Sequence, residues 1–207
     1  MAKPDRIPLF PLDVVLLPAM MLPLHIFEPR YKTMIRHCLG EQMEFGMVLA
    51  SDQSMAKIGC TAAIERITKE YPDGRMDILT EGRSAFRLAE VLDESQYYEG
   101  LVEYLAEEPS ELNPAKEAEL VQLGGQCHVL LFGRPWDEAE PSDPTTLAYR
   151  IAARLPIELA QRQALLEMRK EADRREFLLG WITKLLPQLA DRERRRQRAR
   201  GNGHGLN

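Results

Sequence analysis

The chain has 207 residues, of which 44% are apolar and 29% charged, and its formal charge at pH 7 is -5. This composition is typical of a globular protein with one large domain or two small ones, and it excludes fibrous, collagen-like and wholly disordered chains. The longest apolar stretch, Val14 to Leu24, is broken by Pro18 and Pro23 and is too short to span a membrane. The first residues lack a signal-peptide cleavage pattern. We therefore expect a cytoplasmic protein without a membrane partner.

The charge is distributed unevenly along the chain. Residues 192–207 contain six Arg and one Glu, a net charge of +5, which leaves -10 for residues 1–191. An acidic body repels phosphate backbones. We therefore expect no nucleic-acid partner unless the arginine-rich tail, residues 192–200, supplies the contact.

The cysteine and histidine pattern argues against a metal site. The three cysteines are odd in number and widely spaced, which predicts reduced thiols. The adjacent pairs His37-Cys38 and Cys127-His128 bring together four potential ligands. Neighbours on a helix point about 100° apart, whereas zinc ligands are usually two to four residues apart. We predict no bound metal.

From Ile7 to about Pro109 the apolar pattern is short and strand-like, with Gly, Pro and Asp between the segments. In the sequence YPDG, residues 71–74, proline holds the second turn position and glycine the fourth, which predicts a reversal between two antiparallel strands. Five or more short strands with tight turns indicate a small barrel or curled sheet. The predicted strands lie within residues 46–51, 58–71, 75–82, 84–92 and 99–109.

One helix is predicted inside this half, beginning at Pro29 and ending at Gly40. Its apolar side chains fall on one face and should pack on the sheet. They are Tyr31, Met34, Ile35 and Cys38.

After Pro109 the apolar spacing becomes helical and predicts a small bundle. The third of four helices should begin at Pro156, and the fourth should stop at Pro187. An acidic, proline-rich loop, residues 133–144, contains Trp136 and should be exposed. The four apolar stripes lie within residues 120–130, 147–155, 157–168 and 177–185.

Residues 7–12 read IPLFPL, Leu17-Pro18 follows, and residues 22–31 read LPLHIFEPRY. In this order and spacing they resemble the opening of the N-terminal domain of the Lon protease family, the substrate-recognition part of that ATP-dependent enzyme. Shorter similarities occur in residues 59–62, 73–86 and 155–167, so the resemblance covers about residues 7–187.

The resemblance implies an α+β fold, in which a PUA-like small β barrel with one packed helix is followed by a C-terminal helical bundle. We expect the barrel to cover residues 1–112 and the bundle residues 113–190. Residues 191–207 should form a basic, disordered tail.

The resemblance stops short of the parts that make Lon an enzyme. No GxxxxGK[ST] phosphate loop occurs in the sequence, no segment resembles the Ser-Lys active site of Lon, and the chain ends before an ATPase or peptidase domain could begin. We therefore expect no catalytic residue and no cofactor. The implied function is a non-enzymatic module that binds unfolded or hydrophobic peptide segments, as a recognition or adaptor protein for a protease or chaperone supplied in trans.

A domain that captures unfolded segments needs exposed apolar side chains. The prolines of the opening should hold Met20 and Met21 outward, and methionine adapts to varied partners. The alternative is that Phe10 and Phe27 belong to the barrel core, the usual place of such aromatic residues. The peptide-binding candidates are Phe10, Met20, Met21, Phe27 and Trp136.

The remaining residues of the family motif are expected to be structural. His25 should be a hydrogen-bonded histidine rather than part of a catalytic triad. Arg30 should pair with Glu28 or a barrel carboxylate, and Tyr31 should be core, although both could instead offer polar contacts to a partner. Pro11 and Pro29 complete this group.

The arginine-rich tail leaves a second function class open. A PUA-like barrel with a basic tail would suit an RNA-associated protein, but the tail lacks the interleaved aromatic residues of a stacking platform. A disordered, solubilising tail is the competing interpretation.

Overall fold

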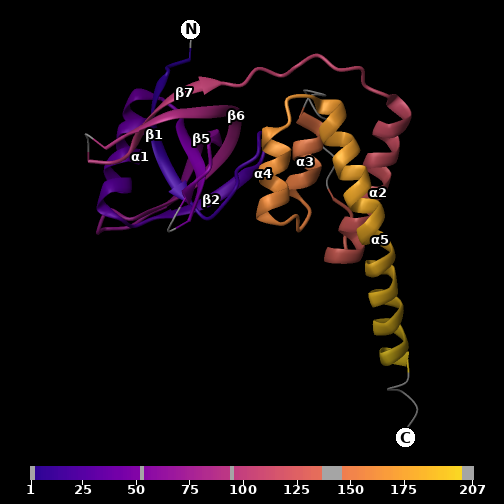
Figure 1. Ribbon diagram of the computed structural model, residues 1–207. Helices are drawn as coiled ribbons and strands as arrows, with labels where there is room; N and C mark the ends of the chain where they lie inside the picture. Colours follow the sequence, from indigo (N-terminus) through magenta and orange to yellow (C-terminus); the bar gives the residue numbers. More distant parts are fainter. Residues whose placement is uncertain (1–2, 52–53, 94–95, 137–145, 202–207) are drawn as a thin grey trace, which may run out of the picture. The chain divides into compact units, whose positions relative to one another are not determined.

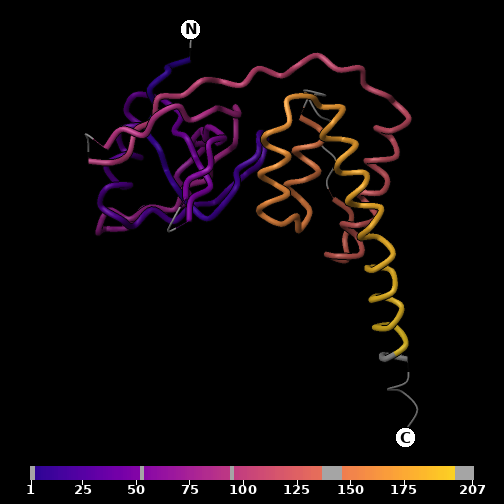
Figure 2. Tube along the Cα trace, viewed as in Figure 1, coloured from indigo at the N-terminus to yellow at the C-terminus, as the bar shows by residue number. Residues whose placement is uncertain are grey.

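The structure is a computed structural model that describes residues 3–51, 54–93, 96–136 and 146–201. The chain forms two compact units. The first contains Met1–Glu108 and Ile157–Arg169, and the second contains Pro109–Pro156 and Lys170–Asn207. Figure 1 shows the elements of each unit and labels most of them, and Figure 2 shows the same chain as a tube.

The first unit is built on one seven-stranded sheet. Its order is β1-β7-β6-β5-β3-β4, and β2 pairs with β6. Because β1 pairs antiparallel with β7 and parallel with β3, the pairings of five strands form a closed circuit. The strands are β1 (Arg6–Leu12), β2 (Met21–Ile26), β3 (Phe45–Ser51), β4 (Ser54–Met55), β5 (Ile58–Glu70), β6 (Met76–Leu92) and β7 (Glu99–Tyr104).

The turn between β5 and β6 confirms the predicted chain reversal. The Gly74 N–H donates to the Tyr71 carbonyl at 2.9 Å, and Gly74 has a φ of 80°, a left-handed conformation that suits glycine. Since β6 is 17 residues long, it pairs with β2 and β5 near this turn and with β7 at its other end.

Helix α1 (Pro29–Glu41) confirms the predicted helix of the first half. Proline occupies its first turn. The helix ends one residue later than predicted, because Gln42 rather than Gly40 takes the left-handed cap conformation, with φ 53°. Its buried face is the predicted set of Tyr31, Met34, Ile35 and Cys38.

Helix α4 (Leu159–Glu167) belongs to the first unit, which differs from the predicted split at residue 112. The Gln163 side-chain amide donates to the Ile58 carbonyl of β5 at 3.0 Å. Just after the helix, the Arg169 carbonyl accepts from the Glu108 N–H at 2.8 Å. These bonds tie residues 157–169 to the sheet, although their helical pattern alone groups them with the other helices.

The described residues of the second unit form three helices, α2 (Pro114–Phe132), α3 (Leu147–Ala153) and α5 (Glu171–Gly201), and α5 packs against both of the others. Asn113 caps the start of α2 by accepting from the Ala115 N–H at 2.9 Å, and Gly133, with φ 73°, ends it. No helix among the described residues is long and apolar enough to cross a bilayer.

The predicted stop at Pro187 is wrong, since α5 continues through it to Gly201. Proline removes the backbone donor that would reach the Thr183 carbonyl, and α5, which packs against α2, continues through this gap in its hydrogen-bond ladder. Residues 191–201 are therefore helical, contrary to the disordered tail that we expected. Residues 202–207 lie outside the described part.

Candidate functional site

The strand β2 presents apolar side chains to solvent on one face. Met21 at its start is 47% exposed, and Phe27, just after its end, is 58% exposed. Side chains of a strand alternate between faces, so Met21, Pro23 and His25 share the outward one, and all three are exposed. Neither Met21 nor Phe27 is therefore part of the buried core.

The neighbouring strand extends this outward face. In the antiparallel register Met21 lies opposite Glu81, Pro23 opposite Leu79 and His25 opposite Asp77. We name this area the β2 surface and define it by six residues. They are Met21, Pro23, His25, Phe27, Tyr71 and Leu79.

A polar and aromatic cluster fixes the His25 end of the β2 surface. The Nδ1 atom of His25 lies 2.5 Å from Asp77 Oδ1, and the Tyr71 hydroxyl donates to Asp77 Oδ2 at 3.0 Å. The imidazole also stacks on Phe27 with 5.9 Å between ring centroids and meets the Tyr71 ring edge-on at 5.9 Å. His25 is thus a hydrogen-bonded histidine, as predicted.

The hydrogen bonds of this cluster favour the ionised form of the Asp77 carboxyl group. The hydrogen bond from His25, with a second from Tyr71, lowers the pKa of Asp77 below its ordinary value of 3.8. Both oxygens of the Asp77 carboxylate are hydrogen-bonded, one to His25 and the other to Tyr71, so the carboxylate positions these two side chains. The cluster orients His25 and Phe27 at the edge of an apolar surface.

Two of the predicted peptide-binding residues are buried. Phe10 is 5% exposed, and its ring lies 4.1 Å from that of Tyr31 and 6.0 Å from that of Phe45, measured between centroids. The expectation that Met20 points outward is wrong, because it is 8% exposed. The chain turns sharply there, with Ala19 at φ 60° and the Met20 N–H bonded to the Leu17 carbonyl at 3.0 Å.

Trp136 belongs to the second unit and packs against α2. A side chain at Gly124 would collide with its indole ring, the Arg154 guanidinium lies 5.6 Å from the ring centroid, and the His128 ring lies 5.9 Å away. The indole is half-buried by these contacts. Most of the loop predicted to surround it, residues 137–144, lies outside the described residues.

The other motif residues have the expected structural partners. Arg30 pairs with Glu28 at 2.9 Å, and its guanidinium lies 4.5 Å from the centroid of the Tyr31 ring. Tyr31 is 4% exposed, and burial raises the pKa of its hydroxyl. Pro11 is half-buried in β1. Glu28, Arg30 and Tyr31 lie at the start of α1, just after the end of β2.

The cysteines are unsuited to nucleophilic chemistry. All three are buried, and this desolvation raises the pKa of Cys38 to about 12 and that of Cys127 to about 11, and raises the pKa of Cys60 as well. Within the part of the chain that the structure describes, no three His, Cys, Asp or Glu side chains are grouped to hold a metal ion.

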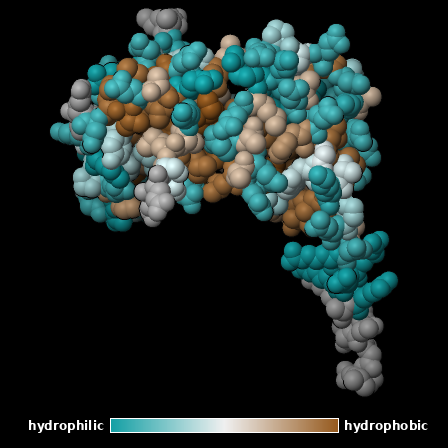
Figure 3. All heavy atoms as spheres, in the orientation of Figure 1, coloured by the Kyte–Doolittle hydropathy of each residue, from teal (hydrophilic) through white to brown (hydrophobic). Residues whose placement is uncertain are grey.

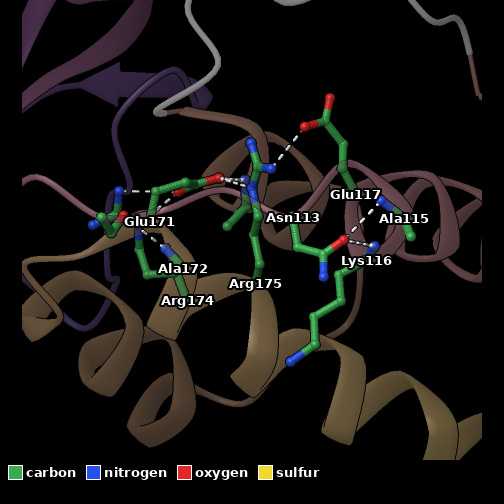
Figure 4. A network of polar contacts seen from close by, with 10 residues as sticks. Asn113, Ala115, Lys116, Glu117, Glu171, Ala172, Arg174 and Arg175 are labelled. Atoms are coloured by element: carbon green, nitrogen blue, oxygen red, sulfur yellow. Dashed lines mark hydrogen bonds and ion pairs between the residues drawn. The ribbon is translucent and has the colours of Figure 1, made fainter.

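Sequence reasoning missed a buried ionic network in the second unit (Figure 4). Glu171 at the start of α5 accepts from Arg174 Nε at 3.0 Å, from Arg175 Nε at 2.8 Å and from the Ala148 N–H of α3 at 3.0 Å. Arg175 reaches Glu117 of α2 at 2.8 Å. The network therefore joins three helices. Its sequence signature is the i, i+3, i+4 spacing of Glu171, Arg174 and Arg175.

The comparison with protein families decides the assignment. The model of the ATP-dependent protease La (LON) substrate-binding domain matches residues 6–184. The chain belongs to this family. The match is to the substrate-binding domain of Lon and not to its ATPase or protease domains.

Curated relatives agree over most of the chain. The Lon protease of Escherichia coli K12 is 26% identical over 212 residues, which cover 94% of this chain and 27% of that protein. Lon protease 2 of Syntrophobacter fumaroxidans is 27% identical over 201 residues, covering 90% and 25%. The chain therefore spans about a quarter of the length of these relatives.

Solved structures share the fold. A Lon N-terminal domain protein from Xanthomonas campestris superposes with a TM-score of 0.64 at 27% identity, over 85% of this chain and 98% of that one. The N-terminal domain of Mycobacterium avium complex Lon protease superposes with a TM-score of 0.62 at 17% identity, over 86% and 98%. The second likeness concerns the fold alone.

Proposed function

We propose that this Lon substrate-binding domain recognises unfolded or hydrophobic protein segments and that the β2 surface is the part that contacts them. One observation carries the proposal: Met21 and Phe27, both large and apolar, are 47% and 58% exposed at the two ends of one short strand. Exposed apolar side chains that cluster in this way are typical of binding sites.

The chemistry of the β2 surface fits a client of variable sequence. Methionine is flexible and polarisable, and adapts to different side chains. Phe27 and Tyr71 add aromatic area, and His25 holds both in place through ring contacts at 5.9 Å. These side chains contribute apolar contact from an exposed strand face, which suits broad selection of apolar segments.

We also propose a finer description of the fold and of the role of the domain. The closed circuit of five strands is interpreted as a PUA-like barrel, and the helices of the second unit as a bundle. The domain acts without catalysis, as a recognition or adaptor module that presents clients to a protease or chaperone. Hydrolysis of ATP or casein by the pure protein, abolished by a point mutation in this chain, would contradict the non-enzymatic role.

A double variant, Met21→Ser with Phe27→Ser, tests the site. Binding of a permanently unfolded, fluorescently labelled casein should weaken several-fold, while the melting temperature stays close to that of the unmodified domain. Val91→Ser is the matched control, because Val91 is also exposed, at 41%, and lies ten residues beyond Glu81 along β6. Equal binding by the double variant and the unmodified domain would remove Met21 and Phe27 from the site.

A second candidate function is RNA association through the end of α5. Arg192, Arg194, Arg195, Arg196 and Arg198 are exposed there, although Arg194 pairs with Asp191. Figure 3 shows this end of the helix as hydrophilic. The observation in its favour is that the arginines lie on an ordered helix, which can follow a phosphate backbone.

Removal of residues 192–207 tests this candidate. Salt-sensitive RNA binding that disappears with the deletion, in a protein that still captures unfolded casein, would support an RNA contact by the tail. Sequence-selective RNA binding that survives the deletion would instead favour recognition by the barrel and contradict the first proposal.

A further inference from the structure

The strand β2 is paired on one side only. It is antiparallel to β6 from Met21, opposite Glu81, to Ile26, opposite Met76. Among the residues that the structure describes, no other strand pairs with it. The main-chain groups on its second edge therefore pair with no described strand.

The phase of the ladder shows which main-chain groups lie on that free edge. The Gly82 N–H donates to the Met20 carbonyl at 2.9 Å, just before the strand. Bonded and non-bonded pairs alternate in an antiparallel ladder. Leu22 and Leu24 therefore direct their main-chain groups toward β6, and Met21, Pro23 and His25 direct theirs away from it.

Two further observations agree with this phase. The Thr80 hydroxyl of β6 donates to the Leu22 carbonyl at 2.8 Å, so that carbonyl does face β6. Pro23, which has no N–H to donate, occupies a non-bonded position, where its presence costs no ladder bond. The free edge thus offers the N–H groups of Met21 and His25 and the carbonyls of Met21, Pro23 and His25.

The free edge and the apolar face involve the same residues. Met21 and Pro23 point their side chains to the β2 surface and their main-chain groups to the edge. A strand added antiparallel here would place each residue that bonds to β2 with its side chain on the face of Met21 and Pro23. Its alternate residues would face the other way. An incoming segment would therefore be selected for an apolar residue at every second position.

We propose that the β2 surface captures clients by strand addition: an extended segment with apolar residues at alternate positions pairs antiparallel with the free edge of β2. The inference rests on the proposed function and specifies the client as extended main chain. Two copies of β2 paired edge to edge would both lack the donor at Pro23, whereas a client strand supplies a donor at each of its positions, so the edge favours a client over a second copy of the domain.

N-methylated peptides test this inference. The probe is a fluorescent peptide in which Val and Thr alternate, flanked by lysines. Methylation of the Val amides removes the donors that bond to β2 and should weaken binding about tenfold or more, whereas methylation of the Thr amides, which point to solvent, should change it little. Both modified peptides lose the same number of donors, so each controls for the other.

Hydrogen exchange of the domain gives a second measurement. The amides of Leu22 and Leu24 should exchange slowly with and without peptide, because they bond to β6. The amides of Met21 and His25 should exchange quickly in the free domain and slowly in the complex.

Equal binding of the two methylated peptides, or binding without protection of Met21 and His25, would overturn strand addition and leave the proposed binding of unfolded segments in place. If neither the peptide nor unfolded casein binds, both the inference and the proposed function fail.

Discussion

Glu171 and Arg174, one helical turn apart on α5, form an ion pair from which solvent is excluded. Their side chains are 1% and 0% exposed, and Arg174 Nη2 lies 2.9 Å from Glu171 Oε2. The other carboxylate oxygen accepts from the Ala148 N–H, so the pair also fixes α3. Loss of one member of a buried pair leaves an uncompensated charge and costs more than the pair itself contributes.

We predict that Glu171→Gln lowers the free energy of unfolding of the second unit by about 3–5 kcal/mol. Urea unfolding followed by tryptophan fluorescence measures it, since both tryptophans, Trp136 and Trp181, lie in that unit. Glu176→Gln is the control on the same helix. Its carboxylate is 75% exposed and lies 3.6 Å from Lys116, so its loss should change stability by less than about 1 kcal/mol.

Adjacent methionines should respond in opposite ways to the same change. Met20 is 8% exposed and Met21 47%. Met20→Ser should cost about 2–5 kcal/mol through the cavity it leaves and the hydroxyl it buries. Met21→Ser should change stability by no more than about 0.5 kcal/mol. Thermal unfolding followed by circular dichroism compares the two variants. Similar losses of stability would contradict the finding that Met20 is buried while Met21 is exposed.

Two glycines should differ as sharply. A side chain at Gly82 would collide with the carbonyl oxygen of Leu17 and lie 3.1 Å from Leu16, so Gly82→Ala should destabilise the first unit by about 1–3 kcal/mol. Gly40, near the end of α1, has no atom within 4 Å of such a side chain. Gly40→Ala should therefore stabilise the helix by up to about 1 kcal/mol. Denaturation midpoints of both variants provide the comparison.

Acid should weaken the His25 cluster. The pKa of Asp77 is lowered, chiefly by the hydrogen bond from His25, so its contribution to stability is present above the unfolded value and is lost as the pH falls through the folded one, below pH 3.8. An NMR titration of the carboxyl carbons should show the pKa of Asp77 rising toward 3.8 in His25→Ala. Asp73, whose low pKa comes from hydrogen bonds with Arg75, should not change.

Local chemistry made part of the fold predictable. Proline and glycine in the turn at residues 71–74 limit the backbone to few conformations, and the structure has the reversal there. Pro29 starts α1, and the apolar spacing identifies its buried face. The exposed position of Phe27 was less predictable, because an aromatic residue in an apolar segment is more often core.

Features that depend on tertiary contacts escaped the sequence. Met20 and Met21 are neighbours in one apolar run, and only the turn at Ala19 decides which is buried. Helix α5 continues past Pro187 although proline removes one backbone hydrogen bond, and its packing against α2 is a tertiary contact that the sequence pattern does not reveal. In the sequence, Glu171 cannot be told from a surface charge, because its hydrogen bond with the Ala148 N–H forms only in the folded chain.

The return of the chain to the first unit at α4 limits how this protein can be divided into fragments. The chain leaves the first unit after Glu108, returns at Ile157 and leaves again after Arg169. A protease that cuts once between residues 108 and 109 would therefore release neither unit. A fragment of residues 1–112 would deprive the Ile58 carbonyl of Gln163 and the Ala106 carbonyl of the Arg169 guanidinium, which donates at 2.9 Å. Any dissection has to keep residues 157–169 with the strands, through a shortened link or as a separately added peptide.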